Sequence, residues 1–256
     1  MDRLADKVGL VTGGGSGIGR AAALAMAREG ARVVVTGRRA APLNETIALI
    51  VSERGEGLAV PTDVSRSAEV TALIEQVVAR YGRLDVACNA AGTVAFAPLV
   101  EASEEDFDRT IATNLKGVWL CMRAEIGQML GQGGGAIVNI SSVNAVRPAT
   151  ESLDYSATKA AVVNLTQAAA LAYAKQGVRV NAINSGAFPT EMLDEAMAYA
   201  SGGSREEGLA QYERFLPIGR LGRLEEIAEA VVWLCSPAAS YVTGHALAVD
   251  GGWAPA

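Results

Sequence analysis

Two side chains four residues apart, Tyr155 and Lys159, could carry out proton transfer. Residues at this spacing share one face of a helix, so the lysine ammonium can lie beside the tyrosine phenol. A phenol with a pKa of about 10 is a poor base at neutral pH, but a nearby cation favours the phenolate and lowers that pKa. Such a pair can give a proton to an alcohol oxygen or take one from it. The spacing alone is weak evidence, because most pairs of this kind only lie on a helix surface.

Two more polar residues could complete this site. Ser142 follows an apolar run, and its hydroxyl could hold a substrate oxygen next to Tyr155. Asn114 lies in the helical stretch 104–131 and could hold a water that links Lys159 to solvent, although a buried structural amide explains it equally well. The residues expected to be catalytic are therefore Asn114, Ser142, Tyr155 and Lys159.

A glycine-rich loop directly after the first apolar run predicts a phosphate site. Residues 12–19 read TGGGSGIG and lead into a helix. Glycines let the backbone approach a pyrophosphate closely, and the helix N-terminus adds N–H groups and the positive end of a dipole. The spacing TGxxxGxG differs from the usual GxGxxG. The loop residues expected to bind a dinucleotide are Gly13, Gly15, Ser16, Gly17, Ile18 and Gly19.

The end of the second apolar run bears on the choice of cofactor. An acid there would bind the ribose 2′-hydroxyl and repel a 2′-phosphate. The chain instead has Gly37, Arg38 and Arg39. Two guanidinium groups can fork onto a phosphate, so NADP(H) is favoured over NAD(H), although the arginines could also be a solvated helix start. Asp63 and Val64 follow the third run, where the carboxylate could meet the adenine or cap the next helix.

Short apolar runs alternate along the chain with longer segments that have helical periodicity, and most of the motifs lie where a run ends or a helical segment begins. The runs expected as buried strands are residues 8–12, 32–36, 57–61, 84–89, 136–140, 178–183 and 246–249, and the expected helices are 18–29, 40–54, 67–81, 104–131, 155–176 and 223–236. This alternation predicts an α/β fold, a single Rossmann-like doubly wound domain over residues 1–256 with a seven-stranded parallel sheet and helices on both faces. Ligands of such sheets bind beyond the carboxyl ends of the strands. The polar stretch of about residues 187–216 is expected to be an inserted substrate loop that acts as a mobile flap.

Composition excludes several classes of protein. The net charge of the 256 residues is −6, and a basic stripe typical of nucleic-acid binders is missing. No run of about 18 uncharged apolar residues predicts a membrane span, and the first residues lack the pattern of a signal peptide. Three scattered cysteines are typical of reduced thiols in a cytoplasmic protein rather than of disulfides. His245, the single histidine, excludes a multi-histidine metal site and a histidine-dependent triad.

Taken together, the motifs resemble the short-chain dehydrogenase/reductase family over essentially the whole chain. The matching pieces are residues 12–19, Asp63, NAAG at 89–92, Asn114, Ser142, YSATK at 155–159, RVN at 179–181 and DGG at 250–252. The resemblance implies a nicotinamide cofactor and a homo-oligomer, usually a tetramer. It implies that Tyr155 is the general acid/base, that Lys159 lowers the pKa of Tyr155 and binds the nicotinamide ribose, that Ser142 polarises the carbonyl, and that Asn114 completes a proton relay.

The resemblance also adds residues to the expected cofactor site. They are Asn89, Ala90, Ala91 and Gly92 after the fourth strand, with Asn89 also supporting that strand, and Gly186 and Thr190 after the sixth. One departure concerns the same turn: Ser185 stands where relatives usually have proline. The serine restores a backbone N–H and removes a fixed φ, so a looser turn is expected.

The expected substrate pocket follows Ser142 and Tyr155 and continues into residues 187–216. Its residues are Ser142, Asn144, Glu151, Tyr155, Ala187 and Met192. A mostly apolar lining favours small hydrophobic ketones or secondary alcohols, whereas an inward Glu151 would pair with an amine or a sugar hydroxyl. The predicted reaction is NAD(P)H-dependent, reversible reduction of a ketone to a secondary alcohol.

Other functions stay open from the sequence. Within the same family they are a 3-oxoacyl carrier-protein reductase, which would need a basic patch, and a sugar or polyol dehydrogenase. Outside it, the alternative is a nucleotide-sensing regulator without catalysis, which need not keep Ser142, Tyr155 and Lys159 together. Trp253, near the end of the chain, is expected to contact another subunit.

Overall fold

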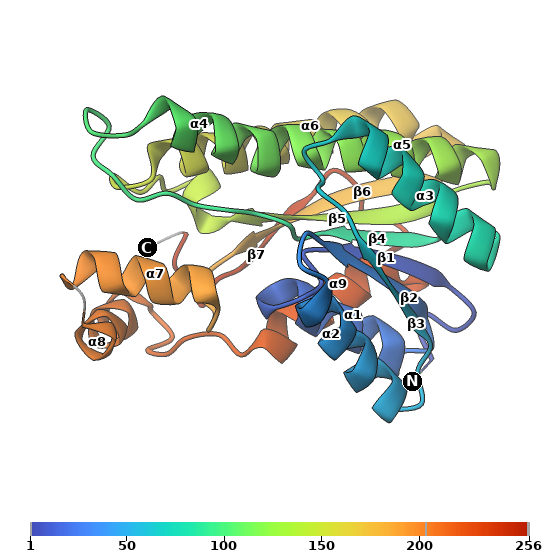
Figure 1. Ribbon diagram of the computed structural model, residues 1–256, viewed down its shortest axis with the longest axis horizontal. Helices are drawn as coiled ribbons and strands as arrows, with labels where there is room; N and C mark the ends of the chain where they lie inside the picture. Colours follow the sequence, from blue (N-terminus) through green and yellow to red (C-terminus); the bar gives the residue numbers. More distant parts are fainter. Residues whose placement is uncertain (1, 203, 255–256) are drawn as a thin grey trace.

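In the computed structural model, which describes residues 2–202 and 204–254, seven parallel strands form a twisted central sheet (Figure 1). The strands are β1 (Val8–Thr12), β2 (Arg32–Gly37), β3 (Gly57–Pro61), β4 (Val86–Asn89), β5 (Gly135–Ser142), β6 (Val178–Ser185) and β7 (Ala246–Val249). Their order in the sheet is β3-β2-β1-β4-β5-β6-β7, and every neighbouring pair is parallel. The order reverses between β1 and β4, so the carboxyl ends of these strands form the crevice where doubly wound sheets bind ligands.

Helices cover both faces of the sheet. They are α1 (Gly17–Arg28), α2 (Ala40–Ser52), α3 (Ser67–Tyr81), α4 (Glu104–Thr110), α5 (Val118–Gly131), α6 (Leu153–Tyr173), α7 (Glu191–Ala200), α8 (Arg205–Phe215) and α9 (Leu224–Cys235). In Figure 1, α1, α2 and α9 lie on one face, and α3, α4, α5 and α6 lie on the other. The predicted doubly wound α/β fold is therefore confirmed.

The core explains why the strands read as continuous apolar runs. Val11 and Val35 point toward α1 and α9, whereas Leu10 and Val34 point toward the helices on the opposite face. All four side chains are buried. A sheet covered on both faces has no solvent-facing side, so apolar residues need not alternate with polar ones.

The expected helix over residues 104–131 is one correction that the structure makes. Between α4 and α5 the chain forms a π-helical segment, Ile111–Gly117, that contains Asn114. Its last residue packs tightly, because a Cβ at Gly117 would lie 2.9 Å from Cγ2 of Val64. Single π-helical turns inside α-helices are frequently found at functional sites.

Several strand and helix limits also differ from the prediction. The fifth and sixth strands extend two residues further than expected, to Ser142 and Ser185, and β4 begins only at Val86. The helix expected over 155–176 already begins at Leu153 and continues after Tyr173 as a short 3-10 turn. Tyr155 therefore lies in the first turn of α6.

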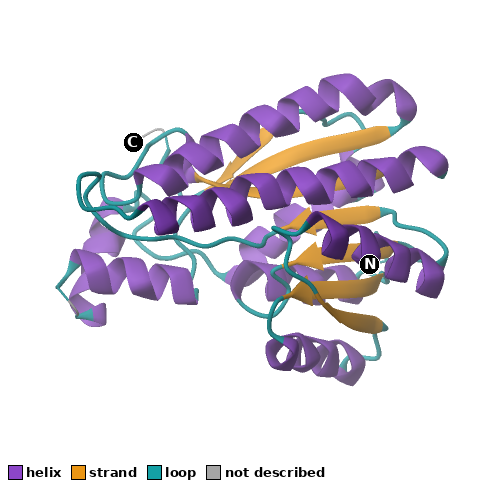
Figure 2. Cartoon of the chain, turned by 45° about the horizontal axis from the view of Figure 1, so that its top comes forward, coloured by secondary structure: helices purple, strands orange, loops and turns teal. Residues whose placement is uncertain are grey.

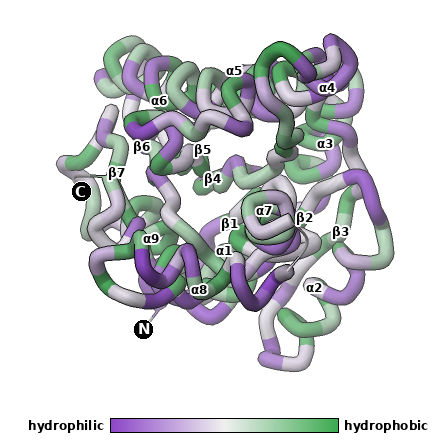
Figure 3. The backbone as a smooth tube through the Cα atoms, turned by 90° about the vertical axis from the view of Figure 1, so that its left-hand side faces the viewer, coloured by the Kyte–Doolittle hydropathy of each residue, from purple (hydrophilic) through white to green (hydrophobic). Residues whose placement is uncertain are grey.

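Residues 187–216 contain helices that the sequence did not suggest. The pair α7 and α8 stands beyond the carboxyl ends of the strands, apart from the two main helical layers (Figures 2 and 3). Thr190 caps α7 by accepting a hydrogen bond from the backbone N–H of Leu193, and Ser204 caps α8 in the same way. The polar residues of this segment are typical of a loop, so the sequence does not predict the two helices. Mobility of the segment stays a prediction.

Two further observations concern the chain as a whole. Cys88, Cys121 and Cys235 are buried and free of disulfides. Of the helices in the described ranges, not one is both long and apolar enough to span a bilayer.

Candidate active site

Ser142, Tyr155 and Lys159 meet at the carboxyl-terminal edge of the sheet. Ser142 is the last residue of β5, and the other two lie on the first turns of α6. The Ser142 hydroxyl lies close enough to the Tyr155 phenol to lower its pKa, and the backbone N–H of Asn144 donates to Ser142 Oγ over 3.1 Å. Lys159 Nζ lies 5.4 Å from the centre of the Tyr155 ring. Together with Asn144, the three residues line one cavity of about 850 Å³.

Burial dominates the protonation of this cluster. It raises the pKa of Tyr155 to about 12, although Ser142 opposes the shift. It lowers the pKa of Lys159 to about 8. Burial destabilises the phenolate more than Ser142 stabilises it, and a lowering of the Tyr155 pKa by Lys159 stays a prediction.

Backbone contacts hold Lys159 in place. Its Nζ donates to the carbonyl oxygen of Ile140 over 2.8 Å, and its own carbonyl accepts a hydrogen bond from Ser141 Oγ over 2.9 Å. Ser141 is in turn held by Ser185, whose hydroxyl donates to the Ser141 carbonyl oxygen over 2.9 Å. The serine in place of the usual proline therefore adds a hydrogen bond between β6 and the strand that ends at Ser142.

Asn114 lies behind the cavity rather than in its wall. Its Oδ1 accepts from the Thr93 N–H over 2.8 Å, and its Nδ2 donates to the Thr93 carbonyl over 2.8 Å. A Cβ built at Gly92 would lie 3.5 Å from Asn114 Oδ1 and 3.8 Å from Lys159 Nζ, so the two side chains converge on this glycine. Asn114 is completely buried. The structural amide considered from the sequence is present, and the proton relay stays a prediction.

The glycine-rich loop can hold a dinucleotide. A Cβ at Gly19 would overlap the carbonyl oxygen of Gly13, and Gly13 itself has a φ of +67° and would place a Cβ 2.9 Å from the Ala91 nitrogen. These positions require glycine, and they leave the N-terminus of α1 open to an anion. The expected cofactor residues that line the cavity are Gly13, Ser16, Gly17, Ile18, Gly19, Ala90, Ala91, Gly92, Tyr155, Lys159, Gly186 and Thr190.

Two other expected cofactor residues lie outside the cavity, with side chains in the core. Asn89 donates from Nδ2 to Glu125 Oε2 and to Asn139 Oδ1, each over 3.0 Å, so its side chain supports the sheet. The side chain of Val64 packs in a small apolar cluster that includes Leu120. Both side chains are therefore held in the core, and contact of Asn89 and Val64 with a cofactor stays a prediction.

The remaining expected cofactor residues lie where β1, β2 and β3 end. Gly15 turns toward Pro42 in α2, and Gly37 ends β2. Arg38 and Arg39 are exposed, and Arg39 Nη2 lies 3.5 Å from Glu191 Oε2 at the start of α7. Asp63 Oδ1 accepts from the backbone N–H and the hydroxyl of Ser65, so it stabilises the turn before α3. This turn-capping role is the alternative that the sequence left open.

The expected substrate residues all line the cavity. Ser142, Asn144, Tyr155, Ala187 and Met192 lie along its wall. Glu151 stands at the exposed end and accepts a hydrogen bond from the Thr150 hydroxyl over 2.6 Å. Glu151 therefore borders the cavity while its carboxylate stays exposed to solvent.

Sequence reasoning missed most of the aromatic lining. Phe96, Tyr199, Tyr212, Phe215 and Trp253 also border the cavity. Trp253, expected at a subunit contact, packs within its own chain against Tyr212, with 5.8 Å between ring centres. Tyr199, Tyr212 and Phe215 are aromatic residues within the polar segment 187–216, and this contrast could have indicated a role in the pocket. No local pattern in the sequence indicates such a role for Phe96.

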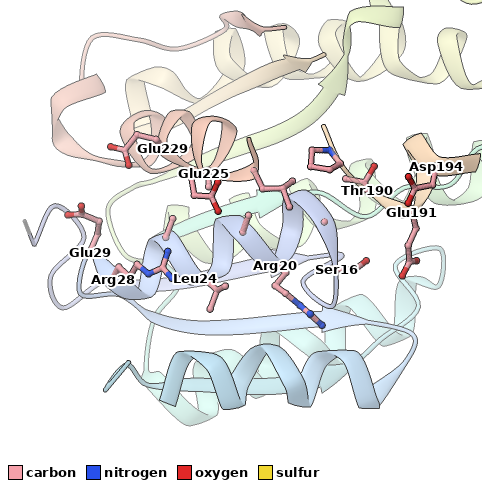
Figure 4. Close-up of a pocket in the computed structure, with 16 residues that line it drawn as sticks. Ser16, Arg20, Leu24, Arg28, Glu29, Thr190, Glu191, Asp194, Glu225 and Glu229 are labelled. Carbon is pink, nitrogen blue, oxygen red and sulfur yellow. The ribbon is translucent and has the colours of Figure 1, made fainter. Parts of the chain in front are cut away.

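A second groove, of about 530 Å³, runs between α1 and α9 from Ser16 and Thr190 toward Glu229 (Figure 4). Several of its charged side chains have partners: Arg20 pairs with Glu45, Arg28 with Glu53, and Glu229 with Arg3. The Ser–Tyr–Lys cluster does not reach it. The groove therefore offers no reacting group beside the glycine-rich loop.

A doubly wound parallel sheet, a glycine-rich loop after β1 and a Ser–Tyr–Lys cluster at the same edge define a class, the Rossmann-fold oxidoreductases that use NAD(P). A family model described as enoyl-(acyl carrier protein) reductase matches residues 13–254. The chain is 42% identical over 252 residues to the short-chain dehydrogenase/reductase astE of Aspergillus oryzae, covering 97% of this chain and 95% of that protein. It belongs to the short-chain dehydrogenase/reductase family, whose members are NAD(P)-dependent oxidoreductases acting on CH–OH groups.

Solved structures agree with this assignment. Levodione reductase superposes with a TM-score of 0.96 at 34% identity, over 99% of both chains. A single-residue variant of actinorhodin polyketide ketoreductase, solved with NADPH, superposes with a TM-score of 0.94 at 35% identity, over 98% of both chains.

Proposed function

We propose that this protein reversibly reduces a ketone to a secondary alcohol, with NADP(H) as the favoured cofactor. The observation that carries the proposal is that Ser142, Tyr155 and Lys159 line the same cavity as the glycine-rich loop, with Lys159 beside the Tyr155 ring. A ketone oxygen needs two donors, one to polarise it and one to give it a proton. Ser142 and Tyr155 supply both.

Ser142 and Tyr155 have different roles in the proposed reaction. The ketone oxygen accepts hydrogen bonds from the Ser142 hydroxyl and the Tyr155 phenol, and Tyr155 transfers its proton to that oxygen. When bound, the nicotinamide supplies the hydride in reduction and accepts it in oxidation. The N–H of Asn144, which donates to Ser142 Oγ, leaves the Ser142 proton free to face the substrate.

Reprotonation of Tyr155 follows from the two pKa values. The Lys159 ammonium has a pKa of about 8 and the phenol one of about 12, so a proton moves downhill from Lys159 to the phenolate. Asn114, which converges with Lys159 at Gly92, would hold the water that returns a proton to Lys159 from solvent. Lys159 would also bind the nicotinamide ribose.

The preference for NADP(H) rests on the carboxyl end of β2. Gly37 leaves room there, and the exposed Arg38 and Arg39 can bind a 2′-phosphate. Burial opposes the lowering of the Asp63 pKa, which comes from hydrogen bonds with Ser65 and from the charges of Arg66 and Arg38, so Arg38 acts on a residue that follows β3. The NADPH in the actinorhodin ketoreductase structure is consistent with this preference.

The acidic residues beside the cavity disfavour one class of substrate that the sequence left open, an acyl group bound to a carrier protein. Acidic side chains on α7 and α8, among them Asp194, Glu195, Glu206 and Glu207, would repel an acidic carrier protein. A free small-molecule ketone is therefore the proposed substrate. The homotetramer and the cytoplasmic location expected from the sequence stay predictions.

The test is NADPH oxidation at 340 nm with a panel of ketones, run alongside NADH. We expect turnover with at least one ketone and a preference for NADPH. Absence of turnover with every ketone, under conditions in which NADPH binds, would overturn the proposal.

A further inference from the structure

Four aromatic side chains from separate segments enclose the outer end of the cavity. Phe96 comes from the loop after β4, Tyr199 from α7 and Tyr212 from α8. Trp253 comes from the tail after β7. The sequence positions are far apart, so only the fold brings these rings to one place.

The rings form two pairs in the lining of the cavity. Phe96 and Tyr199 are stacked, with 5.5 Å between centres and 26° between planes. Tyr212 and Trp253 meet edge to face, at 5.8 Å and 84°. Both geometries are favourable for aromatic pairs. Each pair also joins α7 or α8 to a segment outside residues 187–216, so the two helices are held over the cavity.

The tail that carries Trp253 is itself held in position. Asp250 accepts from the N–H of Gly252 over 3.0 Å and from the N–H of Ala254 over 2.8 Å. The carbonyl oxygen of Trp253 accepts from Arg147 Nη1 over 3.1 Å. The indole is half-buried. Trp253 is therefore a preorganised wall of the cavity, and a ligand need not order it on binding.

Small and apolar side chains also line the cavity, beside polar ones such as Asn144 and Gln211. The small and apolar residues include Val94, Ala187, Met192 and Ala196. The charged residues at this end, Glu151 and Arg147, are exposed. A carbonyl held at Ser142 and Tyr155 thus extends its substituent into a pocket of flat apolar faces.

We infer that the outer part of this cavity holds the ring of an aryl or alicyclic ketone, and that Trp253 is a specificity-determining residue for that ring. The inference rests on the proposed ketone reduction and adds its substrate class. A ring presents flat faces to the aromatic pairs, and it loses less conformational freedom on binding than an open chain with the same number of carbons. Both effects favour the cyclic substrate.

The experiment compares three eight-carbon ketones: acetophenone, 4-ethylcyclohexanone and 2-octanone. For the wild type we expect kcat/KM to be at least about tenfold higher for the ring ketones than for 2-octanone. Trp253→Ala should lower that ratio by about tenfold, and Trp253→Phe should retain most of it. Equal kcat/KM values for ring and open-chain ketones in the wild type, or an unchanged ratio in Trp253→Ala, would overturn the inference.

A matched control and a binding measurement complete the test. Trp119 is exposed on α5, so Trp119→Ala should leave the ratio unchanged. Binding is read from quenching of tryptophan fluorescence by acetophenone, with NADP⁺ present, in the wild type and in Trp253→Phe. Saturable quenching that Trp253→Phe diminishes supports the ring site even where no ketone turns over, which would contradict only the proposed reaction. Quenching that does not saturate contradicts the ring site itself.

Discussion

The ammonium of Lys159 donates to the carbonyl oxygen of Ile140, with 2.8 Å between Nζ and O. This bond ties the lysine on α6 to β5, two residues before Ser142. The chain thereby holds a cation beside a buried phenol without a carboxylate partner for either group among the described contacts. The protonation state of Lys159 is consequently sensitive to pH in the range where enzymes work.

The first prediction follows from the Lys159 pKa of about 8. The cation is present below that pH and is lost above it, so kcat/KM for ketone reduction should be level below about pH 8 and fall about tenfold per pH unit above it. Lys159→Arg keeps a guanidinium charged throughout and should move the falling limb to higher pH, at a lower plateau. The measurement is a pH profile from about pH 6 to about pH 10, and a limb that stays near pH 8 in the variant would refute the assignment.

The second prediction concerns Tyr155. Tyr155→Phe removes the proton donor but keeps the ring, so kcat should fall by about 10² to 10⁴ while the Kd for NADPH changes little. Absorbance at 340 nm gives kcat, and NADPH fluorescence gives Kd. Tyr173→Phe, at the far end of the same helix, is the matched control and should behave as the wild type. Normal turnover in Tyr155→Phe would remove Tyr155 from the reaction.

The third prediction concerns cofactor choice. Arg38→Asp and Arg39→Asp should each weaken NADPH binding by about tenfold to a hundredfold, because a charge-assisted hydrogen bond is replaced by repulsion, with little loss for NADH. Titration of both cofactors checks this. Arg54→Asp, beyond the other end of α2, is the control. An unchanged ratio of the two Kd values in both variants would mean that the arginines are only solvated.

The fourth prediction concerns Ser185, the residue in place of the usual proline. Ser185 and Ser141 are both buried, and Ser185→Ala would leave the Ser141 carbonyl without this donor, at a cost of about 1 kcal/mol. We expect Tm to fall by about 2 to 4 °C. Ser52→Ala, which removes an exposed hydroxyl from α2, should have less effect. Equal Tm values for the wild type and Ser185→Ala would show that the bond contributes nothing to stability.

The fifth prediction concerns a carboxyl group away from the cavity. Burial raises the pKa of Glu125 to about 7, while Asn89 opposes the shift by donating to it. A raised pKa means that the folded state holds its proton more tightly than the unfolded chain. This contribution to stability is fully present below about pH 4.5 and is lost as the pH rises through 7, by up to about 3 kcal/mol.

Glu125→Gln removes this titration and keeps an acceptor for Asn89. Its stability relative to the wild type should therefore increase between about pH 5 and about pH 8, as measured by urea unfolding at several pH values. The neighbouring thiols of Cys88 and Cys121, whose pKa values are raised by burial, stay neutral in this range. Glu105→Gln on exposed α4 is the control. Unfolding free energies that run parallel across this pH range would contradict the prediction.

Local patterns in the sequence were sufficient for the fold and for the centre of the site. Continuous apolar runs mark strands buried on two faces, and all seven expected runs are strands of the sheet. The spacing of Tyr155 and Lys159 places both on one helix face, and glycines 13 and 19 are required by close backbone approach. These signals are legible because periodicity and glycine geometry act over a few residues.

Tertiary structure decided what depends on burial and on contacts between distant segments. Burial raises the Tyr155 pKa because water is removed around the phenol, and no local pattern reports that. The side chain of Asn89 bonds to Glu125 because β4 and α5 meet there. Phe96 reaches Tyr199, and Tyr212 reaches Trp253, only after the sheet has set the four segments side by side. Spacing along the chain fixes which residues share a helix face, whereas solvent exclusion and long-range packing determine their chemistry.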